Sequence, residues 1–102
     1  PPEVEPMAWV KVQGESLKTW TLGYEIQAAQ VTILTDGMPL MATVELWGAS
    51  GWTKQVAEIY NDNGQTRPFV ATIPTPGDAN TICVRNKGPM AFPITVSVDG
   101  LA

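Results

Sequence analysis

Short strand-like segments, separated by turn residues at nearly regular intervals, constrain this chain more than any other feature. The segments are rich in β-branched and aromatic residues, and clusters of Gly, Pro, Asn and Asp lie between them. They span residues 7–12, 17–22, 28–35, 41–47, 54–60, 67–73, 80–86 and 92–98. No stretch carries the 3.6-residue periodicity of a helix. The pattern predicts an all-β fold, an antiparallel β-sandwich of about seven to eight short strands with a jelly-roll or Greek-key arrangement.

Two local features refine this prediction. Pro68 and Pro93 fall inside apparent strands, and because proline cannot donate to a ladder, those strands should lie at an edge or begin pairing late. The sequence "NDNG" (61–64) predicts a hairpin, since Asn-Gly tolerates positive φ. Its clustered oxygens could instead bind calcium, but the spaced acidic ligands and bidentate Glu of a calcium loop are missing, so a turn is favoured.

The length of 102 residues predicts one domain, over residues 7–102. Residues 1–6, "PPEVEP", hold three prolines and no core-forming pattern, which predicts an extended N-terminal arm. The sequence starts with Pro-Pro-Glu and not with Met, so we expect a mature chain from which a targeting peptide has been removed.

Composition and charge exclude several classes of partner. The net charge is −4 and the six basic residues are scattered, which argues against a nucleic-acid partner. No apolar run approaches the roughly 20 residues of a membrane span, so no transmembrane segment is expected. A single cysteine permits no internal disulfide, and no Asn-X-Ser/Thr acceptor occurs. Both absences favour a reducing compartment such as the cytosol or the plastid stroma.

The residue types that act in catalysis are few in this sequence, so we predict that the chain is not an enzyme. Histidine is absent, which removes the usual general base and the commonest metal ligand, and one cysteine cannot build a zinc site. "GASG" (48–51) lacks the Lys and the helix of a phosphate-binding loop. Glu45 and Glu58 lie on strands that could be neighbours, as the carboxylates of a glycosidase must be, but we interpret them as solvent-facing. Neither a metal nor a noncovalent cofactor is predicted.

The tryptophans are the main candidates for partner contact. In "ELWGASGWT" (45–53), Trp47 is two residues after Glu45, so the two side chains should lie on the same, polar face of the strand. A bulge after Leu46 would instead turn Trp47 inward. Trp47 is therefore either core or surface. Trp52 follows a Gly-flanked bend and is expected at the rim. Exposed aromatics suit a protein partner, or a sugar ring stacked on Trp47 and Trp52 in a carbohydrate-binding module.

Cys83 raises a second question of parity. Ile82 and Val84 should face the core, which leaves Cys83 and Arg85 on the other face. The favoured interpretation is a small, half-buried residue in a reducing compartment. The alternative is a thioether to a linear tetrapyrrole (a bilin), with Arg85 pairing a propionate.

The order of four motifs resembles a known family. "SLKTW" (16–20), "TDGMPLMATVELW" (35–47), "NDNGQTRPFVATIPTP" (61–76) and "NTICVRNKGPMAFP" (80–93) follow one another as in the small β-sandwich domain of plastid proteins from algae with red-lineage chloroplasts. Relatives of that kind are light-harvesting γ-type linkers and pyrenoid-shell-type proteins. "GASGWTKQ" (48–55) departs from the loop expected after the ELW strand, and the chain holds one copy of a domain that shell-type relatives duplicate.

The resemblance implies a non-enzymatic assembly role in the chloroplast, on the stromal side. The single copy and the free arm favour a linker subunit of a light-harvesting or photosystem supercomplex, peripheral to the thylakoid membrane. Its partners would be other protein subunits of that photosynthetic complex. A self-assembling pyrenoid-shell-type protein, a bilin-bearing linker and a carbohydrate-binding module remain as alternatives.

The arm supplies the last prediction. Proline holds it extended, so the arm loses less entropy on docking than a flexible tail would. We expect Pro1, Pro2 and Glu3 to contact a neighbouring subunit or an edge strand, with Trp9 and Trp52 near that contact. The alternative is that the arm folds back on its own domain.

Overall fold

All eight predicted segments form strands in the computed structural model, which describes residues 9–75 and 79–101. The strands are β1 (Val10–Val12), β2 (Leu17–Thr21), β3 (Ala28–Leu34), β4 (Leu40–Trp47), β5 (Thr53–Asn61), β6 (Phe69–Pro74), β7 (Thr81–Asn86) and β8 (Ile94–Leu101). The described residues form no helix. They therefore include no helix that is long and apolar enough to cross a membrane. The all-β prediction is confirmed.

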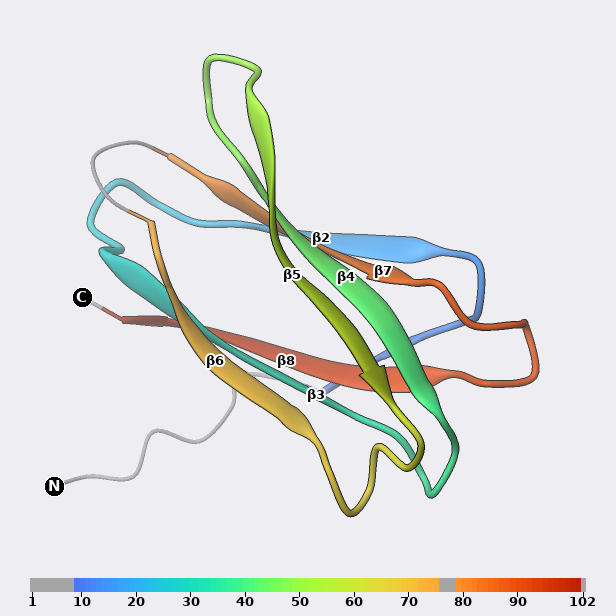
Figure 1. The fold of residues 1–102 in the computed structure, drawn as a ribbon. Coiled ribbons are helices and arrows are strands. Elements are labelled where there is room, and N and C mark those ends of the chain that lie inside the picture. Colours follow the sequence, from blue (N-terminus) through green and yellow to red (C-terminus); the bar gives the residue numbers. More distant parts are fainter. Residues whose placement is uncertain (1–8, 76–78, 102) are drawn as a thin grey trace, which may run out of the picture.

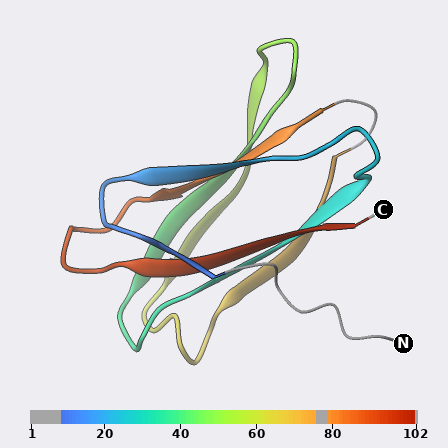
Figure 2. The same cartoon turned by 180° about the vertical axis from the view of Figure 1, so that it is seen from behind.

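The strands form two four-stranded antiparallel sheets, stacked as a sandwich (Figure 1). One sheet, here sheet A, has the order β1-β8-β3-β6, and the other, sheet B, has the order β2-β7-β4-β5. Of the seven connections, only β4 to β5 stays within a sheet. Seen from behind, β8 and β3 run across one layer and β2 and β7 across the other (Figure 2). This order is that of a jelly roll, as predicted.

The core lies between the sheets and follows the alternation of the sequence. In sheet A, Val31 of β3 lies opposite Val98 of β8 and Ala71 of β6. In sheet B, Val44 of β4 lies opposite Val84 of β7, and both are fully buried. Every second residue of the central strands therefore points inward, as expected for side chains that alternate between the faces of a sheet. The remaining positions face outward and make the two outer surfaces.

The hairpin predicted at "NDNG" is wrong. β5 and β6 belong to different sheets, so residues 62–68 cross the sandwich instead of joining paired strands. The Asn63 Oδ1 atom accepts from the backbone N–H groups of Gln65 (2.8 Å) and Thr66 (3.2 Å), which makes an Asx turn. Gly64 is absent from the residues with positive φ. It is tightly packed instead, because an added Cβ would lie 2.6 Å from Thr35 Oγ1.

Both strand prolines behave as predicted. Pro68 directly precedes β6, which is an edge strand of sheet A. Pro93 directly precedes β8, which is an inner strand. In each case ladder pairing begins one residue after the proline, because its nitrogen carries no hydrogen to donate.

One buried polar side chain joins the two sheets at one end of the sandwich. Asn86, at the end of β7, is 2% exposed. Its Nδ2 donates to the carbonyl oxygens of Val12 (3.1 Å) and Phe92 (2.8 Å), and its Oδ1 accepts from the backbone N–H of Gly88 (2.9 Å). Val12 is in sheet A and Asn86 is in sheet B. Asn86 therefore fixes the connection by which the chain passes from β7 to β8.

Candidate functional site

The outer face of sheet B gathers most of the side chains that the sequence singled out. The β4–β7 register places Glu45 opposite Cys83 and Thr43 opposite Arg85. Trp47 lies two residues after Glu45 on β4 and shares its face. Cys83 is absent from the cluster of buried residues between the sheets, whereas Ile82 and Val84 belong to it. The predicted outward parity of Cys83 and Arg85 is confirmed.

Glu45 is the centre of a polar cluster on this face. Its Oε2 accepts from Arg85 Nε at 2.7 Å, and its Oε1 accepts from Trp47 Nε1 at 3.0 Å. These two donors, Arg85 first, lower the pKa of the Glu45 carboxyl below its ordinary value. The same ion pair raises the pKa of the Arg85 guanidinium. Trp47 is therefore an outward, half-buried residue held by its indole N–H.

Cys83 lies beneath this cluster. It sits opposite Glu45 on one side and Thr19 on the other. It is fully buried although it faces outward, so the expectation of a half-buried residue is wrong. Burial, and secondarily the charge of Glu45, raise the pKa of the thiol. A thiol that is inaccessible and protonated is a poor nucleophile. The Nε atom of Arg85 is paired with Glu45, and the bilin alternative stays a hypothesis.

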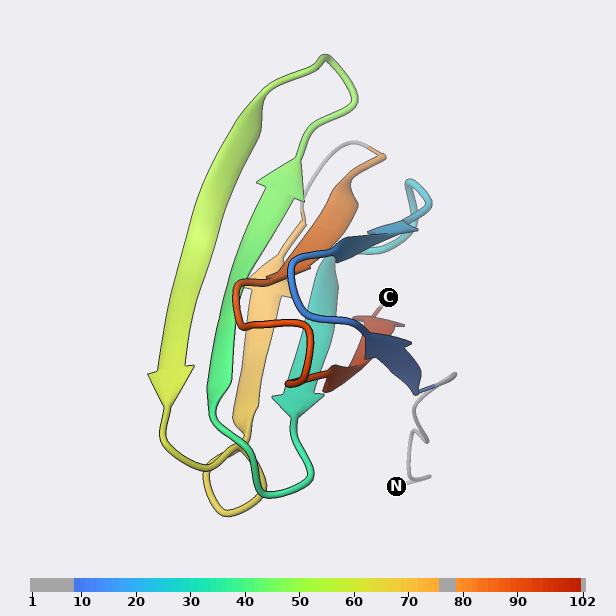
Figure 3. The ribbon, with the colours of Figure 1, turned by 90° about the vertical axis from the view of Figure 1, so that its right-hand side faces the viewer.

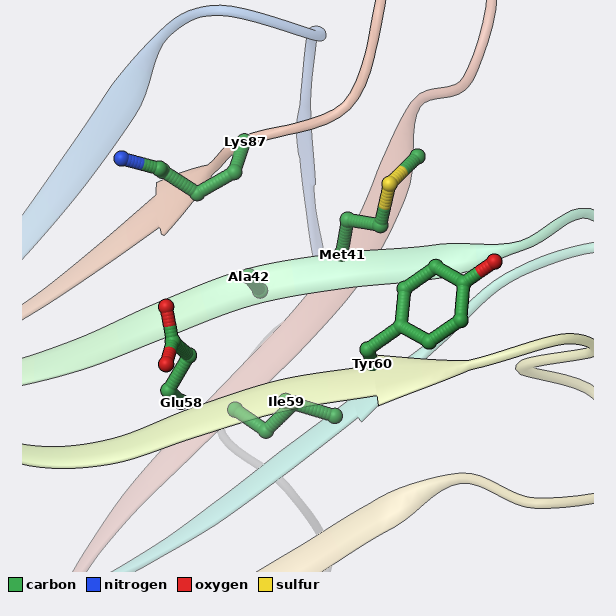
Figure 4. A pocket seen from close by; sticks show the side chains of 6 residues that line it. All are labelled: Met41, Ala42, Glu58, Ile59, Tyr60 and Lys87. Atoms are coloured by element: carbon green, nitrogen blue, oxygen red, sulfur yellow. The ribbon is translucent and has the colours of Figure 1, made fainter.

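A shallow pocket of about 280 Å³ opens at the β5 edge of the same face. Figure 4 shows the ring of Tyr60 beside Met41, with Glu58 extending from β5 and Lys87 on the far side of β4. Tyr60 is 67% exposed. Tyr60 was not predicted from the sequence as a contact residue, although it is the last outward-facing residue of a strand before a turn.

The two carboxylates weighed for catalysis lie on neighbouring strands. Glu45 is opposite Gln55, and Glu58 is opposite Thr43. Glu45 accepts hydrogen bonds from Arg85 and Trp47, so each of its oxygens already has a partner. Among residues 9–75 and 79–101, no three Cys, Asp or Glu side chains gather as metal ligands.

Trp52 lies on a different surface from Trp47. It lines a groove of about 460 Å³ between β5 and β6, together with Leu46, Lys54 and Phe69. Its indole lies against the backbone of Gly48, where an added Cβ would lie 2.1 Å from the ring. Trp52 is 47% exposed, which agrees with its predicted rim position. The structure does not bring Trp47 and Trp52 together as one stacking platform.

Trp9 lies just before β1 and is 48% exposed. β1 and β6 are the opposite edges of sheet A, and the Trp52 groove is on the β6 side, so the two tryptophans lie on opposite sides of one copy. The predicted contact residues Pro1, Pro2 and Glu3 lie outside the described residues. Their role stays a prediction.

Two solved structures align with this chain, and the first shares its fold. A structure of Pseudomonas aeruginosa AlgX aligns with a TM-score of 0.59 at 12% identity, over 96% of this chain and 27% of that one. A ruminal GH26 endo-β-1,4-mannanase aligns with a TM-score of 0.48 at 15% identity, over 88% of this chain and 19% of that one. The chain thus spans less than a third of either protein, and the first likeness supports the sandwich fold alone.

No curated protein matches the sequence. A family model does match, that of the diatom pyrenoid shell protein, over residues 4–100. The match covers nearly the whole chain, from before β1 to the last residue but one of β8, and it agrees with the pyrenoid-shell branch of the resemblance seen in the motifs. The chain therefore belongs to the diatom pyrenoid shell protein family.

Proposed function

We propose that this chain is a non-enzymatic, self-assembling structural component of a pyrenoid shell, and that its partners are other copies of the same domain. The family match over residues 4–100 carries the proposal. A pyrenoid lies within the chloroplast, so the proposed location is the plastid. The resemblance had favoured a light-harvesting linker, with a pyrenoid-shell-type protein as an alternative. The family match supports that alternative better than the linker.

The geometry supports a role in tiling. Each sheet ends in two edge strands, and an edge strand that is left unprotected can pair with a strand of a neighbour. On the outer face of sheet B, Glu45 fixes both Arg85 and Trp47. A face whose long side chains are already held loses less conformational entropy when it is covered by another protein.

The same observations support a non-catalytic role. Glu45 is committed to an ion pair, and Cys83 is buried with a raised pKa. No feature of the described surface favours a bilin, a sugar or a photosystem subunit over another copy of the chain.

Localisation tests the proposal against the linker hypothesis. The chain, fused to a fluorescent protein behind a plastid-targeting leader, would be expressed in a diatom and imaged with chlorophyll autofluorescence. We expect a rim of fluorescence around the pyrenoid, and separation from chlorophyll-protein particles on a native gel. Fluorescence that follows the thylakoids and co-migrates with those particles would refute the shell role and support the linker.

A further inference from the structure

The four edge strands differ in how well they are protected against pairing with another chain. An edge strand exposes unpaired N–H and C=O groups, and soluble proteins block them with short strands, prolines, bulges or charges that point inward. In sheet A, β1 has three residues. The other edge strand, β6, follows Pro68 and ends at Pro74. Both edges of sheet A are therefore poor templates.

In sheet B, β2 and the first half of β5 are also blocked. Lys18 of β2 lies opposite Val84, a core residue, so its charge is on the inward side of the edge. Lys54 of β5 lies opposite Leu46, also a core residue. The β4–β5 register then shifts, because Val44 is opposite Ala57 while Glu45 is opposite Gln55, which leaves Val56 as a bulge.

The second half of β5, Ala57–Asn61, has none of these features. It contains no Lys, no Pro and no bulge, and its pairing with β4 is regular from Ala57 to Asn61. Figure 3 shows β5, in yellow-green, as the outermost strand of its sheet, with β4 beside it. Among the edges that the structure describes, this segment is the one left open to a further strand.

We propose that Ala57–Asn61 pairs antiparallel with the same segment of a second copy, about a twofold axis at Ile59, which joins two B sheets into one eight-stranded sheet. This inference rests on the proposed self-assembly and names the contact that begins it. A twofold contact uses the same surface on both copies, so by itself it makes a dimer. Growth of a shell needs a second contact elsewhere.

Two considerations decide the register of the proposed β5–β5 pairing: the face of the sheet on which each side chain lies, and the charges of the residues that would lie opposite each other. Residues directly opposite each other in an antiparallel pair lie on the same face, so the axis must pass through a residue and not between two. An axis at Glu58 would place Glu58 against itself in the partner. An axis at Tyr60 would place Glu58 against Asp62. Like charges directly opposite are destabilising. An axis at Ile59 avoids both pairs.

In the register at Ile59, Glu58 of one copy lies opposite Tyr60 of the other, twice. Both side chains are on the outward face, since their β4 partners are Thr43 and Met41. Pairing would cover part of the Tyr60 ring, which is 67% exposed and stands beside Met41 (Figure 4). This register therefore opposes no like charges and buries part of an exposed aromatic ring.

Charge changes at Tyr60 test the register. Tyr60→Glu would place two Glu–Glu pairs across the axis, so we expect dimerisation at least about tenfold weaker than in the wild type. Tyr60→Lys would place Lys opposite Glu58 twice, so dimerisation should stay within about threefold of the wild type. The double variant Glu58→Lys/Tyr60→Glu restores opposite charges and should recover the dimer. Tyr24→Glu is the matched control, because Tyr24 is 71% exposed and lies outside the strands.

The measurement is sedimentation equilibrium of the wild type and the four variants, from micromolar to millimolar protein, with thermal unfolding to confirm that each is folded. A monomeric wild type at every concentration would overturn the proposal. So would equal weakening by Tyr60→Glu and Tyr60→Lys, or a Tyr60→Glu dimer as stable as that of Tyr24→Glu. If no β5 dimer forms but the fluorescent fusion still surrounds the pyrenoid, the proposed contact is wrong and the shell role holds. If the β5 dimer forms but the fusion does not surround the pyrenoid, the contact holds and the shell role is wrong.

Discussion

Replacing Asn86 by Ala should destabilise the domain more than any exposed change. The substitution removes three side-chain hydrogen bonds, to the carbonyls of Val12 and Phe92 and the N–H of Gly88. Each bond is worth about 1 kcal/mol net, and each buried partner left without water adds to the cost. We expect a loss of about 3–5 kcal/mol, a large share of the roughly 5–15 kcal/mol typical of a domain.

Urea unfolding followed by tryptophan fluorescence measures this loss. With a slope of roughly 1–2 kcal/mol per molar, the midpoint should fall by about 1.5–5 M. Asn61→Ala is the control, because it removes one exposed bond to the Arg67 carbonyl and should cost about 1 kcal/mol or less. Asn86→Asp keeps the Gly88 bond but cannot donate, so it should also be strongly destabilising. If Asn86→Ala costs no more than Asn61→Ala, the buried amide does not hold the sheets together.

Three further outcomes follow from the site. Because Arg85 lowers the pKa of Glu45, their pair stabilises the fold above the carboxyl's unfolded pKa of about 4.3 and stops doing so as pH falls through the lower folded value. Glu45→Gln should therefore cost about 0.5–1 kcal/mol in urea at pH 7 and less as the pH falls and the carboxyl is protonated, and a cost that does not change with pH would contradict the ion pair. Cys83 should react with a thiol reagent only after denaturation, and rapid native labelling would show that it is accessible. Gly48→Ala should push Trp52 from its place and increase acrylamide quenching of tryptophan, whereas unchanged quenching would mean that the indole does not rest on Gly48.

Much of the fold follows from local pattern. Side chains in a strand alternate, so the sequence Val-Thr-Ile around Thr32 and the sequence Ile-Cys-Val around Cys83 predict which residues are core. The same alternation predicted that Cys83 and Arg85 face outward, and the register confirms it. Proline's missing donor predicted where β6 and β8 begin.

What the sequence did not predict depends on contacts between distant strands. "NDNG" has the composition of a hairpin, but whether two strands share a sheet is decided by packing across the sandwich. The burial of Cys83 depends on the strands that flank β7, where Thr19 and Glu45 lie opposite it, and this pairing joins distant parts of the chain. The separation of Trp47 from Trp52 follows from the loop between them, in which Gly51 adopts a φ of 102°.

The unprotected edge segment of β5 also could not be predicted from the sequence alone. Recognising it requires knowing that β5 is an edge strand and that Lys54 points inward, and both come from the sheet order and register. The segment itself, Ala57–Asn61, has an ordinary strand composition.

Electron cryo-microscopy of the purified chain at high concentration tests the central claim most directly. We expect ordered sheets or tubes in which the B sheets of neighbouring copies join through β5, and we expect them to be lost in Tyr60→Glu but not in Tyr24→Glu. Dispersed single domains at every concentration would contradict self-assembly, and an ordered lattice with β5 exposed to solvent would contradict the proposed contact.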